Sequence, residues 1–277
     1  MPGCPPELLD ALRAAGQAPV RELDLPGNGE LVRYRGEGDK PGKPNCWVVY
    51  HGGQHPVAMF GSWRTDFRGT WFARSTKPLT RAERTTMHRQ AREREAARRE
   101  AQGQVHAEAR QRAQALLSKA RPATSAHPYL QRKGVHAFGL LQLRQMLVVP
   151  AFDSAGLLHT LQFIGPDGTK RMLTGGRIRG CYFPIGKPGR DLLLCEGYAT
   201  GATLRMASGE AVAVAFSAGN LLPVALALRA KFPRLRIVVC ADNDRFTPGN
   251  PGVAAATAAA KAVRGLVVVP QFSEGTE

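Results

Sequence analysis

The sequence is poor in acidic residues and has no long apolar run. Its 277 residues include 22 Asp and Glu against 38 Lys and Arg, which gives a formal net charge of +16. This imbalance favours a polyanionic partner such as nucleic acid, although an Arg-rich coding bias of the source organism would also produce it. No stretch of about 18 apolar residues occurs, which excludes a membrane-spanning helix and any membrane partner.

Three sequence signals are missing as well. The five cysteines are scattered without a C-x-x-C pair, so we expect no zinc site and assign no cysteine a chemical role. No G-x-x-x-x-G-K-[ST] motif is present, so we expect no ATP-driven motor. The N-terminus has no charged head followed by an apolar stretch, so we expect no secretory signal and predict a cytoplasmic location.

Residues 1–80 predict a small mixed α+β segment. A short helix is expected over 5–15, and "CWVVYHGG" (46–53) and "VAMFGSWRT" (57–65) predict two strands joined by a turn. Aromatic residues gather here near several arginines. Such rings either stack nucleic-acid bases or form the core of a small sheet, and core packing is the commoner case. The aromatic residues are Trp47, Tyr50, Phe60, Trp63, Phe67, Trp71 and Phe72, and the arginines are Arg64, Arg68 and Arg74.

The middle of the chain predicts two further segments. Residues 81–121 are rich in Ala, Arg, Glu and Gln and predict a long basic helix or linker, which either follows phosphates or spaces two domains. Residues 122–190 predict a mixed subdomain with antiparallel hairpins, because turn clusters at 153–156 and 166–168 interrupt strand-like runs.

Residues 191–277 alternate short apolar runs with helical stretches of ten to fifteen residues. This alternation predicts βαβ units and a parallel, Rossmann-like sheet with flanking helices, so the fold class is α/β. Functional groups collect at the carboxyl ends of such strands. The run "DLLLCEG" ends in Glu196, and "RIVVCADND" ends in Asp242 and Asp244.

If these strands are neighbours, the three carboxylates Glu196, Asp242 and Asp244 converge on one pocket. They cannot all stay ionised side by side unless a cation neutralises them. Oxygen ligands without His or Cys select Mg²⁺ or Mn²⁺ over zinc, and these ions act on phosphate substrates. Taken singly, each carboxylate could instead be an ordinary turn or capping residue.

The motifs "LLLCEGYATGATL", "AVAVAFSAGNLLPVA" and "IVVCADND" resemble the Toprim domain, in which a Glu follows the first strand and an Asp-x-Asp follows the third. The segments "HPYLQRKGV" and "LLHTLQFIGPDGTKRMLTGGRIRGCYFPIG", with the N-terminal "CWVVYHGGQHPVAMFGSWRT", resemble Toprim-type primases of plasmids and phages, including conjugative-transfer primases. The resemblance covers most of the chain from about residue 30.

This resemblance implies a DNA primase that makes short RNA primers on single-stranded DNA. Glu196 would act as general acid/base or metal-organising carboxylate, and Asp242 and Asp244 would hold Mg²⁺ while ribonucleoside triphosphates are joined. The hairpin region offers contacts to template or triphosphate, namely Lys170, Arg171, Arg177 and Arg179.

Primases of this family differ from the present sequence in two ways. Bacterial replicative primases carry a zinc-binding module without counterpart here, so we expect residues 1–80 or a partner to recognise the template. Relatives usually continue beyond the equivalent of "VVVPQFSEGTE" into an acidic segment and often a helicase-type region. The resemblance also implies a replicative helicase as a partner. A Toprim nuclease and an inactive single-stranded-DNA-binding accessory protein are the alternative functions.

Overall fold

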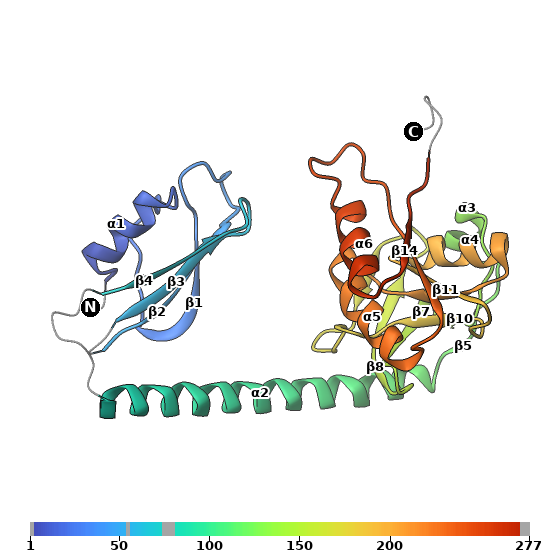
Figure 1. Ribbon diagram of the computed structural model, residues 1–277, viewed down its shortest axis with the longest axis horizontal. Coiled ribbons are helices and arrows are strands. Elements are labelled where there is room, and N and C mark those ends of the chain that lie inside the picture. Colours follow the sequence, from blue (N-terminus) through green and yellow to red (C-terminus); the bar gives the residue numbers. More distant parts are fainter. Residues whose placement is uncertain (1–2, 54–55, 74–80, 272–277) are drawn as a thin grey trace. The chain divides into compact units, whose positions relative to one another are not determined.

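The computed structural model describes residues 3–53, 56–73 and 81–271, and the chain divides into two compact units, residues 1–90 and 91–277 (Figure 1). Residues 272–277, at the end of the run "VVVPQFSEGTE", and Arg74 lie outside the described residues. In the described part of the chain, no helix has the length and apolar character needed to cross a membrane.

The first unit is a four-stranded antiparallel sheet with one helix, which we call the N-terminal sheet. The strands pair in the order β1-β2-β3-β4. The predicted helix and two strands are confirmed, whereas β1 and β4 were not predicted, because their Gly, Arg and Asn content weakens the strand signal. The elements are α1 (Pro6–Ala14), β1 (Asn28–Tyr34), β2 (Cys46–His51), β3 (Val57–Ser62) and β4 (Phe67–Phe72).

A single core lies between α1 and one face of the N-terminal sheet. Leu8 and Leu12 of α1 pack against Val48, Ala58 and Phe60 of the central strands, and all five side chains are buried. The spacing of four places both leucines on one face of the helix.

A buried carboxylate ties the loops of this unit together. Asp39 accepts N–H groups of Gly36 and Asn45, each at 3.1 Å, and its other oxygen accepts from the Asn45 amide and pairs with Arg64 at 3.1 Å. Burial alone would raise the pKa of Asp39, but these donors outweigh burial and hold the pKa below its ordinary value.

Helix α2 (Arg81–Leu117) is the predicted basic helix. Most of its described surface is exposed, as expected from a sequence without an apolar stripe. Its last turns are different, because Ala113, with Leu116 and Leu117 beside it, packs on Val148 and Leu161 in the second unit. This end of the helix is therefore part of the fold of the second unit.

The second unit begins with an antiparallel sheet in the order β5-β6-β7-β8-β9, which we call the hairpin sheet. The predicted hairpins are confirmed, with turns after β7 and after β8 at the two turn clusters. The elements are β5 (Arg121–Pro122), α3 (Pro128–Lys133), β6 (Leu141–Leu143), β7 (Met146–Phe152), β8 (Leu158–Ile164) and β9 (Lys170–Met172).

The second sheet of this unit, the C-terminal sheet, has the order β10-β12-β11-β13-β14. The strands β11 to β14 are parallel, as predicted, and β10 is added antiparallel at one edge. The elements are β10 (Phe183–Ile185), β11 (Asp191–Cys195), α4 (Tyr198–Ser208), β12 (Ala211–Val214), α5 (Ala218–Lys231), β13 (Arg236–Cys240), α6 (Pro251–Ala262) and β14 (Leu266–Val268).

The strands β11, β12 and β13 of the C-terminal sheet are buried on both faces, whereas the edge strand β14 is exposed. On one face Leu194 and Val239 pack against α5 and α6, and on the other face Val212 and Val214 pack against α4 and against the hairpin sheet. Such two-sided burial explains why these strands read as continuous apolar runs. Because the hairpin sheet lies against this core, its residues can reach the ends of β11 and β13.

Candidate active site at the carboxyl ends of β11 and β13

The two predicted acidic motifs lie at the ends of adjacent strands. Strands β11 and β13 pair in parallel, with Leu194 opposite Val239, so their carboxyl ends meet at the same edge of the sheet. Glu196 follows β11 by one residue, and Asp242 follows β13 by two. The sequence predicted that the carboxylates would converge if these strands were neighbours. The strands are neighbours, so this condition is met.

The carboxylates disturb each other's ionisation. Burial raises the pKa of Glu196, and the charges of Asp242 and Asp244 raise it further. Burial and the charge of Asp244 likewise raise the pKa of Asp242. Carboxylates that are partly desolvated beside other carboxylates favour binding of a cation or a proton. This edge of the sheet therefore holds an excess of unneutralised negative charge.

The backbone around Glu196 is held by the neighbouring strand and helix. Its carbonyl oxygen accepts the N–H of Phe216 at 2.7 Å, and its carboxylate accepts the N–H of Ala218 at the start of α5. Phe216 has a φ of +72°, in the left-handed region that a bulky residue rarely adopts. Such strain costs about 1–3 kcal/mol and concentrates at functional sites.

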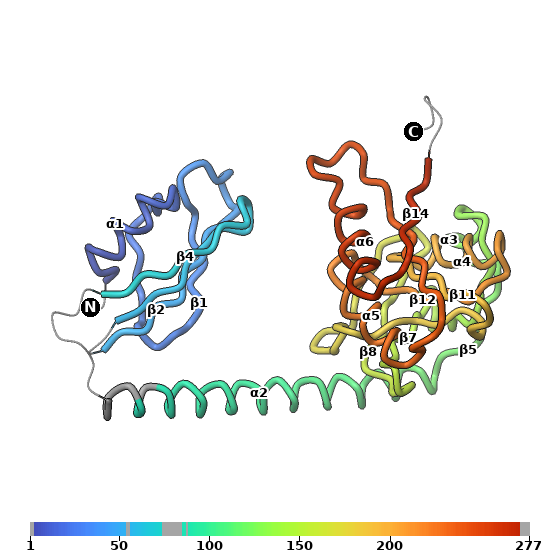
Figure 2. Tube along the Cα trace, in the orientation of Figure 1, coloured from blue at the N-terminus to red at the C-terminus, as the bar shows by residue number. Residues whose placement is uncertain are grey.

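The loop from β13 into α6, whose course can be followed in Figure 2, carries Asp244 and holds it by hydrogen bonds. Its side chain accepts the N–H of Gly252 at 3.1 Å, and its own N–H donates to Asn250 at 3.0 Å. The Asn250 amide in turn donates to the Asn243 side chain at 2.8 Å. Asp244 thus accepts an N–H of the first turn of α6, whose N-cap residue is Asn250, at a helix end where a negative charge is favourable. The sequence had left such an ordinary local role open for each carboxylate.

Lys170 brings a positive charge to the carboxylates. In the hairpin sheet it lies opposite Ile164, whose side chain is in the core shared with the C-terminal sheet. Its charge lowers the pKa of both Glu196 and Asp242, against the effects that raise them. A Cβ built on Gly197 would lie 3.6 Å from the Lys170 ammonium nitrogen. Of the predicted basic residues, Lys170 is the one that the structure brings to the carboxylates.

The other three predicted basic residues lie elsewhere in the hairpin region. Arg171 is opposite Phe163, on the face that turns to α2, and is exposed. Arg177 pairs with Asp153 at 3.2 Å and contacts His159, so its guanidinium group already serves a local cluster. Among the residues that the structure describes, the Arg179 side chain has no hydrogen-bond or ion-pair partner.

The donor chemistry of this edge fits a hard divalent cation, since Glu196, Asp242 and Asp244 supply oxygen ligands alone. The geometry is less complete. Within the residues that the structure describes, no three His, Cys, Asp or Glu side chains stand close enough together to hold a metal ion. Asp244 is also turned to the N–H of Gly252. The residues therefore fit a metal ion by type and charge, without forming a closed ligand cage.

One buried residue that the sequence did not reveal connects the hairpin region to the C-terminal sheet. The Asn220 amide in α5 donates to the carbonyls of Cys181 and Ala215 at 2.9 and 2.8 Å, and its oxygen accepts the N–H of Gly180 at 2.8 Å. The only sequence signal was its place after the small-residue turn "SAG". Asn220 acts as a positioning residue, because it fixes the segment that leads from the hairpins into β10.

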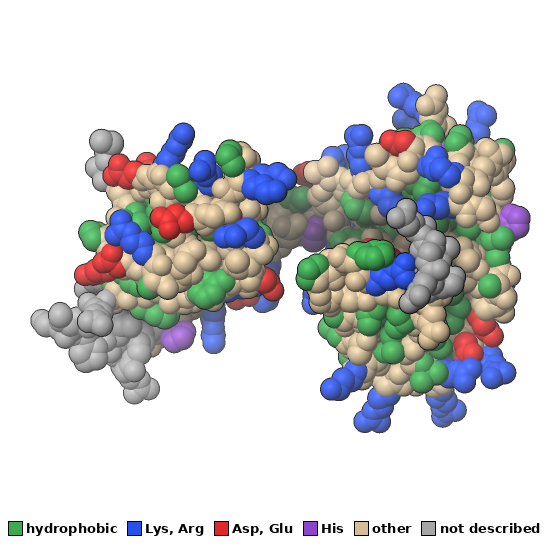
Figure 3. Space-filling view, turned by 90° about the horizontal axis from the view of Figure 1, so that it is seen from above, with side chains coloured by type: hydrophobic (Ala, Val, Ile, Leu, Met, Phe, Trp, Pro, Cys, Tyr) green, Lys and Arg blue, Asp and Glu red, His purple; other side chains and the backbone are tan. Residues whose placement is uncertain are grey.

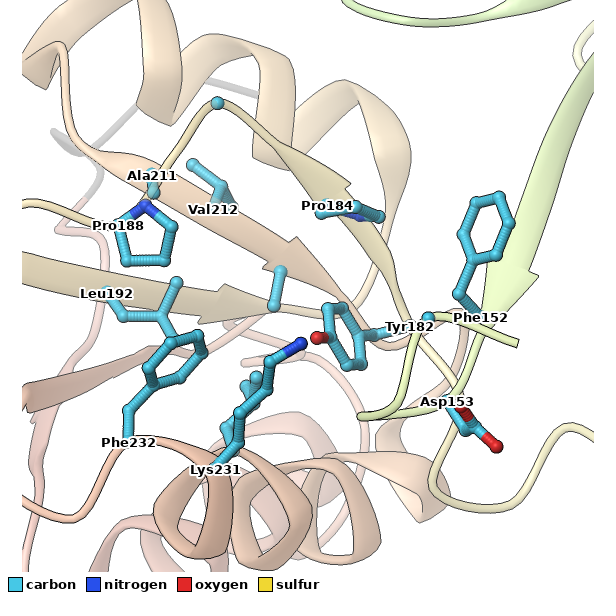
Figure 4. A pocket seen from close by; sticks show the side chains of 14 residues that line it. Phe152, Asp153, Tyr182, Pro184, Pro188, Leu192, Ala211, Val212, Lys231 and Phe232 are labelled. Atoms are coloured by element: carbon cyan, nitrogen blue, oxygen red, sulfur yellow. The ribbon is translucent and has the colours of Figure 1, made fainter. Parts of the chain in front are cut away.

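A cavity of about 330 Å³ lies apart from the carboxylates, between β10, β12, the end of α5 and the β7–β8 turn (Figure 4). Its lining is largely apolar, with Phe152, Tyr182 and Phe232, and Lys231 points toward the Tyr182 ring. Neither the three carboxylates nor Lys170 belongs to this lining. The acidic site is thus separate from this cavity.

Positive charge is concentrated next to the acidic edge, in the hairpin region. On the face of the second unit shown in Figure 3, Lys and Arg side chains project in many places and acidic side chains are few. Between residues 122 and 190 the acidic residues are Asp153 and Asp167, and the basic residues are Arg132, Lys133, Arg144, Lys170, Arg171, Arg177, Arg179, Lys187 and Arg190. This charge is complementary to a nucleic-acid backbone.

Comparison with known proteins supports this assignment. Residues 191–275 match the family model of the Toprim domain. Two curated proteins of Escherichia coli, both named DNA primase TraC, are similar: one is 39% identical over 263 residues, covering 90% of this chain and 24% of its own length, and the other is 35% identical over 284 residues, covering 96% and 19%. The chain thus spans a quarter or less of these relatives.

Among solved structures, the primase fragment of the bacteriophage T7 primase-helicase protein aligns with 55% of this chain and 66% of its own, at 14% identity and a TM-score of 0.40. This superposition is too partial to identify the fold, which follows from the topology and the family match. The predicted resemblance to the Toprim domain and to primases is confirmed. Residues 191–275 carry a Toprim domain, and the chain is similar over nine-tenths of its length to a segment of DNA primase TraC.

Proposed function

We propose that this chain synthesises short RNA primers on single-stranded DNA, with Mg²⁺ or Mn²⁺ bound by Glu196, Asp242 and Asp244. The observation that carries the proposal is the meeting of Glu196 and Asp242 at the ends of adjacent strands, with Lys170 of the hairpin sheet beside them. The similarity to DNA primase TraC over most of the chain supports it.

The proposed chemistry is nucleotidyl transfer. The 3′-hydroxyl group of a nucleotide paired to the template attacks the α-phosphorus of an incoming ribonucleoside triphosphate. A new P–O bond forms at the α-phosphorus, its bond to the bridging oxygen of the β-phosphate breaks, and pyrophosphate leaves. The divalent ion, when bound, would neutralise charge on the triphosphate oxygens. Glu196 would take the proton of the attacking hydroxyl, and its raised pKa makes it a better base than an ordinary carboxylate.

Lys170 would bind a phosphate of the incoming nucleotide. Its ammonium group lies near two carboxylates, and once a bound cation neutralises them it would be available to a phosphate of the triphosphate. Arg171, Arg177 and Arg179 are proposed as contacts to the template strand. To contact the template, the Arg177 guanidinium group would have to bind a phosphate while it keeps its ion pair with Asp153.

The experiment that tests the proposal is primer synthesis from labelled ribonucleotides on a single-stranded DNA template, with Mg²⁺, with Mn²⁺ and with a chelator. We expect oligoribonucleotides only when a divalent ion is present. Asp242→Asn should lower the rate at least a hundredfold, because it removes a carboxylate that stabilises charge in the transition state. The matched control is Asp191→Asn at the opposite end of β11, where the carboxylate pairs with Arg236, and it should leave synthesis unchanged.

Two other outcomes would replace the proposal. Degradation of the template without oligomer formation would identify a Toprim nuclease. Template binding without either reaction would identify an accessory protein. Normal synthesis by Asp242→Asn would disprove the assigned carboxylate site even if the chain is a primase.

Two variants in one strand separate the roles of the basic residues. Lys170→Gln should raise the KM for ribonucleotides, whereas Arg171→Gln, on the opposite face of β9, should leave that KM unchanged and weaken template binding. An equal effect of both variants on the nucleotide KM would contradict the role proposed for Lys170. A helicase partner and a cytoplasmic location stay predictions, because no described contact bears on them.

A further inference from the structure

The N-terminal sheet has one covered face and one open face. Helix α1 packs on the face that carries Val48, Ala58 and Phe60 (Figure 1). Because side chains alternate along a strand, the neighbouring residues point to the other side. These outward positions, which we call the open face, are Leu31 and Arg33 in β1, Trp47, Val49 and His51 in β2, Val57, Met59 and Gly61 in β3, and Arg68, Thr70 and Phe72 in β4.

The open face exposes large apolar side chains. Phe72 is 68% exposed, Met59 52% and Trp63, directly after β3, 50%. The sequence favoured core packing for the aromatic residues of this segment, and that holds for Phe60 and Trp71, which pack in the core. It is wrong for Trp63 and Phe72. Exposed apolar surface of this kind marks an interaction site.

An aromatic platform is built at one end of this face. The rings of Trp47 and Trp63 lie 6.1 Å apart, and the Arg33 guanidinium carbon lies 4.5 Å above the Trp63 ring. Trp47 extends over Gly61, where a Cβ would lie 2.8 Å from the indole ring. A Cβ there would also lie 2.3 Å from the Phe67 carbonyl oxygen, so both the backbone of β4 and the Trp47 ring require glycine at this position. Planar groups held in this way can stack on nucleic-acid bases.

The charge of the open face indicates which partner covers it. The outward positions include Arg33 and Arg68 and no acidic residue, and Arg68 has no ion-pair partner among the residues that the structure describes. A second copy of this face would bring arginines against arginines, which is unfavourable. A phosphate backbone complements two arginines that flank aromatic rings.

We propose that the open face binds single-stranded nucleic acid, with bases stacked on Trp47, Trp63 and Phe72 and phosphates paired with Arg33 and Arg68. A single strand is required, because bases in a duplex are not free to stack on side chains. The proposal goes beyond primer synthesis, since it concerns binding at a place that contains none of the three carboxylates.

Intrinsic fluorescence tests this directly, because Trp47, Trp63 and Trp71 are the three tryptophans of the sequence and all lie in the first unit. The full chain is titrated with a dT oligonucleotide, and we expect quenching that saturates. A duplex of the same length should quench much less. Nucleic acid bound by the second unit alone would leave the fluorescence unchanged, so oligonucleotide binding without quenching would overturn the proposal.

Variants sharpen the test. Trp63→Ala should raise about tenfold the dissociation constant measured by fluorescence quenching. Trp63→Phe, which keeps a ring, should restore most of the lost affinity. Arg68→Gln should reduce the slope of log K against log salt concentration by about one, because one phosphate contact is lost. Arg13→Gln in α1, on the covered side of the sheet, should leave this slope unchanged. Wild-type affinity in Trp63→Ala would contradict the proposal.

Two more measurements separate this proposal from its competitors. Asp242→Asn should lose synthesis and keep quenching, so failure of the proposed primase function leaves this binding site testable. Sedimentation of the free protein reports self-association. A dimer that Arg68→Glu strengthens or Trp63→Ala dissociates would show that a second copy covers the open face, and the proposal would then be wrong.

Discussion

Replacing Gly252 with Ala should distort the acidic site, because the added methyl group would press against the loop that carries Asp242 and Asp244. Gly252 is the second residue of α6, and a Cβ built there would lie 2.4 Å from the Asp242 carbonyl oxygen and 2.9 Å from the Asp244 carboxylate. Ordinary contacts begin at 3.4 Å, so the backbone at Asp242 would have to move by roughly 1 Å. The clash is with backbone and cannot be relieved by a rotamer change.

This displacement has two measurable consequences. Overpacking costs about 1–3 kcal/mol, and the helix propensity of Ala returns about 1 kcal/mol at most, so the melting temperature should fall by a few degrees. A shift of about 1 Å in a catalytic group costs on the order of a hundredfold in rate. We therefore expect Gly252→Ala to fold, to melt slightly lower and to lose about 99% of its primer synthesis.

The matched control is Gly219→Ala. Gly219 is likewise the second residue of a helix that follows a strand of the C-terminal sheet, but a Cβ there meets nothing within 4 Å. This variant should gain up to about 1 kcal/mol and keep its activity within a factor of two. If Gly252→Ala and Gly219→Ala are equally active, the loop after β13 does not position the reacting groups, and the reasoning fails.

Three further predictions concern stability. Asp39→Ala leaves buried N–H groups unpaired and should destabilise the first unit by about 3–5 kcal/mol, measured by tryptophan fluorescence in urea. Asn220→Ala removes three hydrogen bonds and should cost about 3 kcal/mol by thermal unfolding; a loss below about 1 kcal/mol would refute its positioning role. Burial would raise the pKa of Asp153, but hydrogen bonds, led by that of His159, hold it below its ordinary value. Its stabilisation should therefore be complete above about pH 4 and disappear as pH falls through the lowered pKa, so the destabilisation caused by Asp153→Asn should be largest at pH 7 and should shrink as the pH falls below about 4.

The sequence alone determined the α/β alternation and its acidic ends. Apolar runs such as "RIVVCADND" bury both sides of a strand, and that demand leaves few folds other than a parallel sheet between helices. Glu196 and Asp242 then follow, because parallel strands bring their carboxyl ends to one edge. The strand, turn and acidic residues are local signals, because each depends on residues within one strand or turn, whereas the pairing of β11 with β13 is a tertiary feature.

Tertiary structure decided which neighbouring residues belong to the site. Lys170 and Arg171 are adjacent and both basic, and only the pairing of β9 with β8 shows that Lys170 faces the carboxylates. Asn220 looked like one polar residue of a helix, and its three partners lie far away along the chain or in a turn. Composition does not reveal which face of a strand is covered.

The same limit applied to the N-terminal sheet. The sequence showed aromatic residues beside arginines and left stacking and core packing open. Strand register assigned Trp71 to the covered face and Trp47 to the open face, with Trp63 beside it. A period of two residues tells which side chains share a face, but the helix that covers one face lies elsewhere in the sequence. Only long-range packing therefore decides which aromatic residues are core and which remain free to bind.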